Sequence, residues 1–170
     1  MARPDLSVIP EGYKGYVTLA KEYDFLDALD IARKRMAELV QTLPEAKGEY
    51  RYGPDKWTIK ELLCHLIDAE RIFTYRALRF ARNDKTALHG FEENDYAPEA
   101  NAHGRTLAEI AQEAMHVRQS TVDLYKSFTP EMLQRSGTAN GKTLSVFHLG
   151  YVIAGHELHH YNILRERYLQ

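Results

Sequence analysis

Four long segments of this chain repeat apolar residues every three to four positions, the pattern of helices that bury one face. By that spacing we expect helices at about residues 20–43, 58–82, 106–128 and 143–168. No stretch shows the alternation typical of a half-buried strand, and no internal repeat is present. The sequence therefore predicts an all-α fold, a four-helix bundle in which the apolar stripes share one core.

The expected helices carry start signals in the sequence. Thr58 and Glu61 have the spacing of a capping box, and Thr106 and Glu109 repeat it. Thr129-Pro130 is typical of an N-cap followed by a first helical residue, which predicts a short helix to about Arg135. These signals agree with the boundaries that the apolar spacing suggests.

The connections between the expected helices differ in kind. Residues 44–57 and 83–105 are long and irregular, and long loops in compact domains tend to be functional. Asn140-Gly141 predicts a turn ahead of the last long helix. Bundles with long connections need not alternate up and down.

Length and charge limit the classes of protein to consider. The 170 residues fit a single domain, with residues 1–19 as an N-terminal extension that packs on the bundle. The 22 basic and 24 acidic residues give a formal net charge of −2 without a basic run, so no nucleic-acid partner is expected. No apolar run reaches the roughly 20 residues that span a membrane. A first segment without a signal-like stretch and a single cysteine, Cys64, favour a cytoplasmic location.

The stretch AGHELHHYNIL, residues 154–164, holds three of the eight histidines. At about 100° per residue, His156 and His160 lie about 40° apart in the apolar stripe of the last helix. A buried imidazole needs a hydrogen-bond partner or a metal, because an unsatisfied polar group in a core costs about 1–3 kcal/mol. Both a metal site and a pair of hydrogen-bonded core histidines are compatible with the spacing.

The letters of residues 156–160 also satisfy H-E-x-x-H, the helix motif of zinc proteases. The extended form of that motif ends in a third histidine, and this chain has Glu166 there. We therefore interpret Glu157 as a solvent-facing helical residue and seek the third ligand upstream. His65, at the edge of the apolar stripe of residues 58–82, is the best candidate.

Three imidazole ligands would leave coordination positions open, as in catalytic metal sites. Neutral nitrogen ligands suit zinc, nickel, cobalt or iron. A cation of this kind would lower the pKa of a ligated water or thiol and so provide a nucleophile near pH 7.

The segments KWTIKELLCHLIDAERIF and YVIAGHELHHYNILRERY together resemble the DinB-like superfamily of four-helix bundle proteins. GYKGYVTLA, RYGPDKW and LHGFEENDY also resemble one bacterial branch of it. The resemblance implies an up-down-down-up bundle, a homodimer, and a divalent metal on His65, His156 and His160. Nickel or zinc is the first expectation for that metal, followed by iron, cobalt or manganese. Relatives include bacillithiol- and mycothiol-dependent transferases, in which the metal activates a low-molecular-weight thiol cosubstrate, and hydrolases.

Four further residues are candidates for substrate binding from their positions alone. Arg76 projects near the His65 side of its helix and could hold a substrate carboxylate, although a surface arginine is the alternative. Glu93 and Tyr96, in the long loop, could line the mouth of the pocket or simply be solvated. Arg118, on the third long helix, could bridge to that loop.

Two functions follow for this chain. The first is a metal-dependent enzyme, of transferase or hydrolase type, that activates a thiol or water against a small electrophilic molecule. The second is a non-catalytic, dimeric helical module that binds a metal or a ligand. A purely structural bundle with satisfied core histidines is a third reading, and it predicts that a chelator leaves the melting temperature unchanged.

Overall fold

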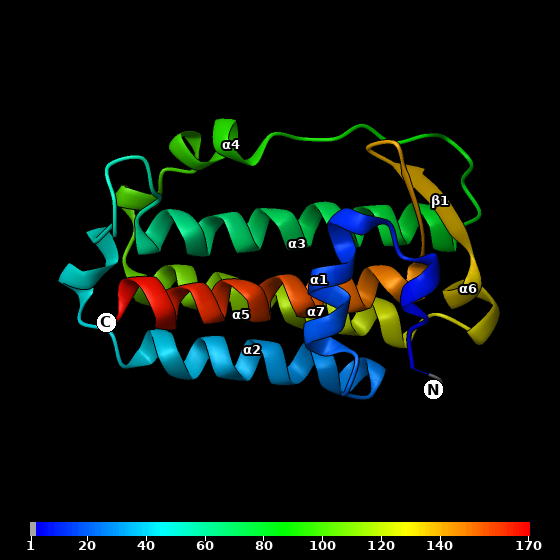
Figure 1. Ribbon diagram of the computed structural model, residues 1–170, viewed down its shortest axis with the longest axis horizontal. Helices are drawn as coiled ribbons and strands as arrows, with labels where there is room; N and C mark the ends of the chain where they lie inside the picture. Colours follow the sequence, from blue (N-terminus) through cyan, green and yellow to red (C-terminus); the bar gives the residue numbers. More distant parts are fainter. Residues whose placement is uncertain (1–2) are drawn as a thin grey trace.

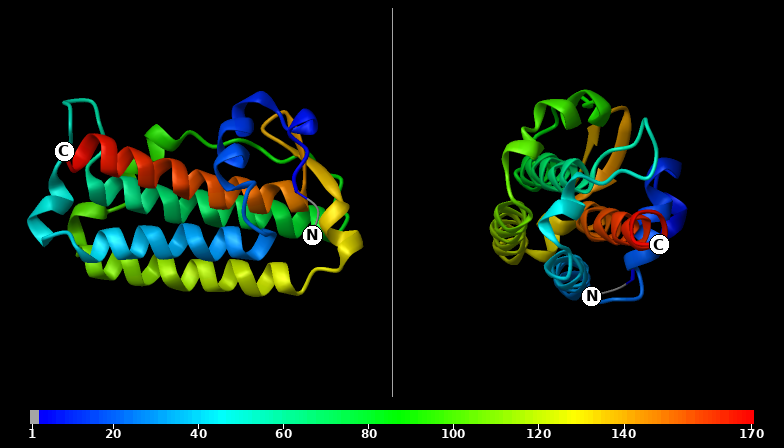
Figure 2. Two further views of the ribbon diagram at one scale, coloured as in Figure 1. Left: turned by 60° about the horizontal axis from the view of Figure 1, so that its bottom comes forward. Right: turned by 90° about the vertical axis from the view of Figure 1, so that its left-hand side faces the viewer.

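The computed structural model describes residues 3–170 and contains a bundle of four long helices (Figure 1). Helices α2 and α7 run in one direction along the bundle, and α3 and α5 run in the other (Figures 1 and 2). The up-down-down-up order is therefore confirmed. The bounds are Phe25–Gln41 for α2, Ile59–Ala81 for α3, Leu107–Lys126 for α5 and Val146–Ile163 for α7.

Both predicted capping boxes form. The Thr58 backbone N–H donates to Glu61 Oε2 at 2.7 Å, and the Glu61 N–H donates to Thr58 Oγ1 at 3.1 Å. Thr106 and Glu109 make the same exchange at 2.8 and 3.2 Å. Each box satisfies backbone donors that the first helical turn leaves without a partner, which explains why α3 and α5 begin where the sequence predicts.

The first predicted helix starts about five residues too early. Residues 11–20 form a separate helix, α1 (Glu11–Ala20), and a turn follows it before α2 begins after Asp24. Helix α1 lies across α7 (Figure 1). Gly155 of α7 allows this crossing, since a Cβ atom there would overlap the backbone carbonyl of Tyr16 in α1.

We expect Gly155→Ala to lower the free energy of unfolding by about 1–3 kcal/mol, because α1 must move away from α7 to accept the methyl group. Urea denaturation measures this loss. Gly15→Ala on α1 is the matched control, because a Cβ atom at Gly15 meets nothing within 4 Å. The control variant should gain up to about 1 kcal/mol from helix propensity. Equal effects of the two substitutions would contradict the close α1–α7 contact.

A small hairpin precedes the last helix, and the expectation of no strands is wrong at this point. Strands β1 (Ser136–Ala139) and β2 (Lys142–Ser145) pair antiparallel around Asn140-Gly141, the predicted turn. Both turn residues have positive φ, 50° and 68°, as this kind of tight turn requires. Helix α7 therefore begins at Val146 rather than near 143. Four-residue strands are too short to show alternation in the sequence.

The segment 83–105 is less irregular than predicted. It contains a short helix, α4 (Glu93–Glu99), and a 3-10 turn, η3 (Ala102–Gly104). The Glu92 side chain caps α4 by accepting the Asn94 backbone N–H at 3.3 Å.

The predicted short helix after Thr129 is present as α6 (Pro130–Gln134). The remaining short 3-10 elements are η1 (Leu6–Val8) and η2 (Glu45–Glu49), and a π-helical turn, η4 (Leu164–Tyr168), follows α7.

Each of the four long helices contributes one charged residue to a buried ion cluster inside the bundle. Arg33 of α2 lies 3.2 Å from Glu70 of α3 and 3.1 Å from Glu157 of α7. Arg118 of α5 lies 2.8 Å from Glu70 and 2.9 Å from Glu157. All four side chains are less than a tenth exposed. Burial without pairing would be costly for any of these charges, so the two arginines and two glutamates must fold together.

Two sequence expectations are wrong at this cluster. Glu157 is 2% exposed rather than solvent-facing, since two arginines on other helices neutralise it. Arg118 does not bridge to the long loop, because its guanidinium is engaged by the two glutamates and by the Leu29 carbonyl.

Among the described residues, no helix is both long enough and apolar enough to cross a membrane.

Candidate metal centre

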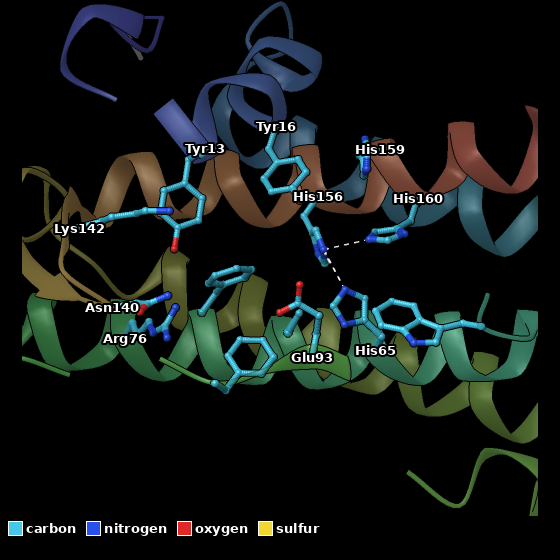
Figure 3. Close-up of a pocket in the computed structure, with 15 residues that line it drawn as sticks. Tyr13, Tyr16, His65, Arg76, Glu93, Asn140, Lys142, His156, His159 and His160 are labelled. Atoms are coloured by element: carbon cyan, nitrogen blue, oxygen red, sulfur yellow. Dashed lines mark hydrogen bonds between the residues drawn. The ribbon is translucent and has the colours of Figure 1, made fainter. Parts of the chain in front are cut away.

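Three imidazoles from α3 and α7 meet inside the bundle (Figure 3). His156 Nε2 lies 3.1 Å from His65 Nε2 and 3.2 Å from His160 Nε2. One nitrogen from each of the three rings lies within 4.8 Å of the other two, and each residue is at most 9% exposed. The structure thus brings together the three histidines that the sequence singled out.

Hydrogen bonds among the three rings do not explain this arrangement. A neutral imidazole offers one lone pair, so His156 Nε2 cannot accept full hydrogen bonds from both neighbours. His160 Nδ1 is also buried without a hydrogen-bond partner among residues 3–170. Polar atoms left in this state are costly in a core, which argues against purely structural histidines.

The electrostatics keep the rings neutral and able to coordinate. Burial lowers the pKa of His65 to about 4 and, with the neighbouring imidazoles, that of His160 to about 3. Burial, followed by the adjacent His160 and His65 rings, lowers the pKa of His156 well below 6.5. Three neutral nitrogens that all lie within 4.8 Å of one another suit one cation at roughly 2.0–2.2 Å from each. The residues present therefore fit a divalent metal ion.

Aromatic residues surround the three imidazoles. The Trp57 ring lies 4.7 Å from the His65 ring, and the Tyr16 ring of α1 lies 5.1 Å from the His156 ring. The Tyr168 hydroxyl donates to the Trp57 carbonyl at 2.8 Å, so the last turn of the chain holds Trp57 in place. These contacts restrict the rotation of the imidazoles.

A cavity of about 350 Å³ opens beside the three imidazoles. Its walls come from α1, α3, the segment that leads into α4, the β1–β2 hairpin and α7, as Figure 3 shows. This volume is in the range of small-molecule sites. The three imidazoles and a space for a small ligand therefore lie together.

Residues 28–164 match the DinB superfamily. The chain belongs to the DinB superfamily. A protein of Oceanobacillus iheyensis named as an inferred metal-dependent hydrolase is 25% identical over 149 residues, which cover 85% of this chain and 83% of that protein. YfiT from Bacillus subtilis, described as a probable metal-dependent hydrolase with an unusual four-helix bundle topology, superposes with a TM-score of 0.77 at 12% identity. That superposition covers 86% of this chain and 85% of YfiT, and it shows a shared fold.

The other predicted site residues of this DinB-superfamily chain are divided between three places. Arg76 and Glu93 line the cavity beside the imidazoles. Arg76 is 4% exposed, so it is not the surface arginine of the alternative reading. Tyr96 is 47% exposed and lines a neighbouring pocket between α3 and residues 86–91, which shares Arg76 and Phe91 with the cavity. Arg118 lies in the buried ion cluster, outside the cavity.

Sequence reasoning assigned no role to four residues that reach this cavity from α1 and from the hairpin. Tyr13 and Tyr16 come from α1, and Asn140 and Lys142 come from the hairpin. Tyr13 and Tyr16 lie in GYKGYVTLA, a segment of the family resemblance that assigned them no role, and the Asn140-Gly141 turn indicated a bend but not its position in space. The Cys64 thiol is not among the cavity residues, and burial raises its pKa to about 11, so it is unsuited to act as a nucleophile.

Proposed function

We propose that this DinB-superfamily protein is a metal-dependent hydrolase that acts on a small electrophilic molecule. The convergence of His65, His156 and His160 at one wall of a cavity carries this proposal. The descriptions of the Oceanobacillus and Bacillus proteins, as an inferred and a probable metal-dependent hydrolase, support it. A bound zinc or nickel ion would supply a Lewis acid that lowers the pKa of a water or thiol ligand.

The protein's own side chains would hold the metal, orient the reactants and exclude solvent. Burial keeps the three ligands in their neutral, metal-binding form at pH 7. Three protein ligands would leave coordination positions for reactants on a bound ion, and the cavity lies beside the three imidazoles. The rings of Tyr16, Trp57 and Phe73 surround the site and limit the access of solvent.

Glu93 is the one carboxylate among the described residues that line the cavity. Its side chain points into the space near His65 and His156 (Figure 3). A carboxylate at this place can accept a proton from the attacking nucleophile and donate it to the leaving group. We assign that proton transfer to Glu93.

Glu93→Gln should lower turnover by about 100-fold or more, because an amide of the same shape cannot transfer the proton. Steady-state kinetics measures the change, and metal analysis should give the same stoichiometry as wild type. Glu99→Gln, on the same helix but outside the cavity, should leave turnover unchanged. A variant at position 93 with full activity would rule out this role.

The proposed function is tested by metal loading and a panel of small esters, lactones and amides. The chelated protein should be inactive, and zinc or nickel at one equivalent should restore hydrolysis. Adding a low-molecular-weight thiol separates the two chemistries, since a dependence on the thiol with transfer to the substrate would indicate a transferase instead. Stoichiometric metal with no turnover in either assay would favour the non-catalytic module.

A further inference from the structure

Arg76 is the exception among the buried cations of residues 3–170. Arg33 and Arg118 each pair with Glu70 and Glu157, and Lys60 pairs with Glu45 and Glu49. Arg76 is just as buried but has no carboxylate within 4.0 Å in the described chain. Its guanidinium donates to the His89 carbonyl at 3.0 Å. A buried charge without a counter-ion is costly, which suggests that a ligand supplies the negative charge.

A second cation reaches the same end of the cavity from the hairpin. Lys142 Nζ lies 5.0 Å from the centre of the Tyr13 ring and forms no ion pair with any described residue. Gly12 leaves room for this amino group, because a Cβ atom there would lie 2.7 Å from it. Asn140, at the tip of the hairpin, adds an amide group. All three residues line the cavity, and Figure 3 shows them at its end away from the imidazoles, with the Tyr13 side chain beside Lys142.

The cavity carries an excess of positive charge before any metal binds. Arg76 and Lys142 are cationic, Glu93 is the one acidic residue among the lining residues described, and the histidine ligands are neutral. A divalent cation at the imidazoles would increase this excess. Sites with such a field concentrate anions.

An apolar section separates the two ends. His65, Ala69, Phe73 and Arg76 follow one face of α3, at spacings of four, four and three residues. Eleven residues of helix rise about 16 Å, so His65 and Arg76 lie at opposite ends of the cavity. Phe73 of α3 lies between them, since its ring centre is 6.0 Å from that of His156 and 5.6 Å from the guanidinium carbon of Arg76. Phe91 of the long loop also lines the cavity.

We propose that Arg76, Lys142 and Asn140 form an oxyanion-binding subsite for the substrate. The substrate class is then a small molecule with a carboxylate or phosphate group, joined through an apolar part to the bond that is cleaved beside the imidazoles. The second half of this statement rests on the proposed hydrolase function. The subsite itself does not, because it consists of different residues.

The test is calorimetric binding to chelated, metal-free protein at low ionic strength. The probes are phenylacetate, phenylphosphonate and the neutral phenylacetamide. Wild type should prefer one of the two anions over the amide by about 10-fold or more, because hydrogen bonds to charged groups are stronger than those between neutral groups. The stronger anion identifies carboxylate or phosphate as the natural group. Two anions that bind no better than the amide would overturn the subsite.

Substitutions locate the binding. Arg76→Gln should abolish the preference for the anion, and Lys142→Gln should reduce it by about 3- to 10-fold. Lys85→Gln, which removes the same charge from an exposed position outside the cavity, should not change it. A preference that persists in both cavity variants would refute the assignment.

Because Arg76 has no counter-ion, Arg76→Gln should melt at about the wild-type temperature. A clearly lower melting temperature would indicate a structural cation instead. If Arg76→Gln does not fold, the anion preference of Lys142→Gln tests the subsite instead, because Lys142 is only half-buried.

The failure of this proposal is distinguishable from that of the proposed function. His65→Ala should lose the metal but keep the anion preference. Wild type that binds anions selectively but no metal would leave the subsite standing and refute the hydrolase. Wild type that hydrolyses neutral esters with metal but shows no preference for anions would support the hydrolase and refute the subsite.

Discussion

His65→Ala abolishes stoichiometric binding of zinc or nickel, as the first expected result. Loss of one of three ligands should weaken metal affinity by more than about 100-fold, since changes in outer-shell partners alone cost about 10–100-fold. The same result is expected for His156→Ala and His160→Ala. Calorimetric titration together with metal analysis of the purified protein measures it.

His159→Ala is the matched control for the three ligands. His159 also lines the cavity from α7, and its ring packs on Tyr16 with centres 5.3 Å apart, but it is not part of the three-imidazole cluster. This variant should bind metal with wild-type stoichiometry. Equal losses in His159→Ala and His65→Ala would show that the substitutions act through the fold rather than through the ligands.

Thermal melting adds a second readout of the same centre. Because a ligand that binds only the folded state stabilises it, a chelator should lower the melting temperature of metal-loaded wild type. The chelator should not change the melting temperature of His65→Ala. A wild-type melting temperature that changes with neither metal nor chelator would support the reading in which the histidines are structural.

The second large effect is expected in the buried ion cluster. Glu70→Ala leaves Arg33 and Arg118 with Glu157 as their one remaining carboxylate, inside the core. Removing one partner of a buried ion pair costs about 3–5 kcal/mol, because the remaining charge stays desolvated. Urea denaturation measures the loss. The exposed Lys34–Asp30 pair, at 2.7 Å, provides the control, and Asp30→Ala should cost less than about 1 kcal/mol.

The same glutamate makes stability depend on pH. Burial alone would raise the pKa of Glu70, but Arg118 and then Arg33 hold it below its ordinary value of 4.5. The unfolded chain therefore takes up the proton first, so this stabilisation is fully present above about pH 4.5 and is lost as the pH falls further. Urea midpoints measured between pH 6 and pH 3 should fall less steeply for Glu70→Gln than for wild type.

Two residues of the buried ion cluster lie on the helices that carry the three clustered histidines. Glu157 follows His156 directly on α7, and its carboxylate is held by arginines from α2 and α5. Glu70 lies on α3, the helix that carries His65. The four charges thus connect the two helices that carry the three clustered histidines. Substitutions here should change metal affinity through the positions of α3 and α7 rather than through direct contact.

The sequence alone determined the four long helices, their caps and the three histidines. Helix periodicity and capping boxes depend on residues three or four positions apart, so a linear sequence records them. The pairing of His156 with His160 is local in the same way. The choice of His65 as their partner needed the resemblance to the DinB-like superfamily as well as the apolar stripe.

The tertiary structure alone decided what surrounds those histidines. Glu157 is polar and off the centre of its stripe, and only Arg33 and Arg118, distant in sequence, make its burial possible. Lys142 reaches the cavity because a hairpin of four-residue strands replaces the predicted start of α7. Contacts of this kind depend on the packing of distant segments, and no pattern of neighbouring residues encodes them.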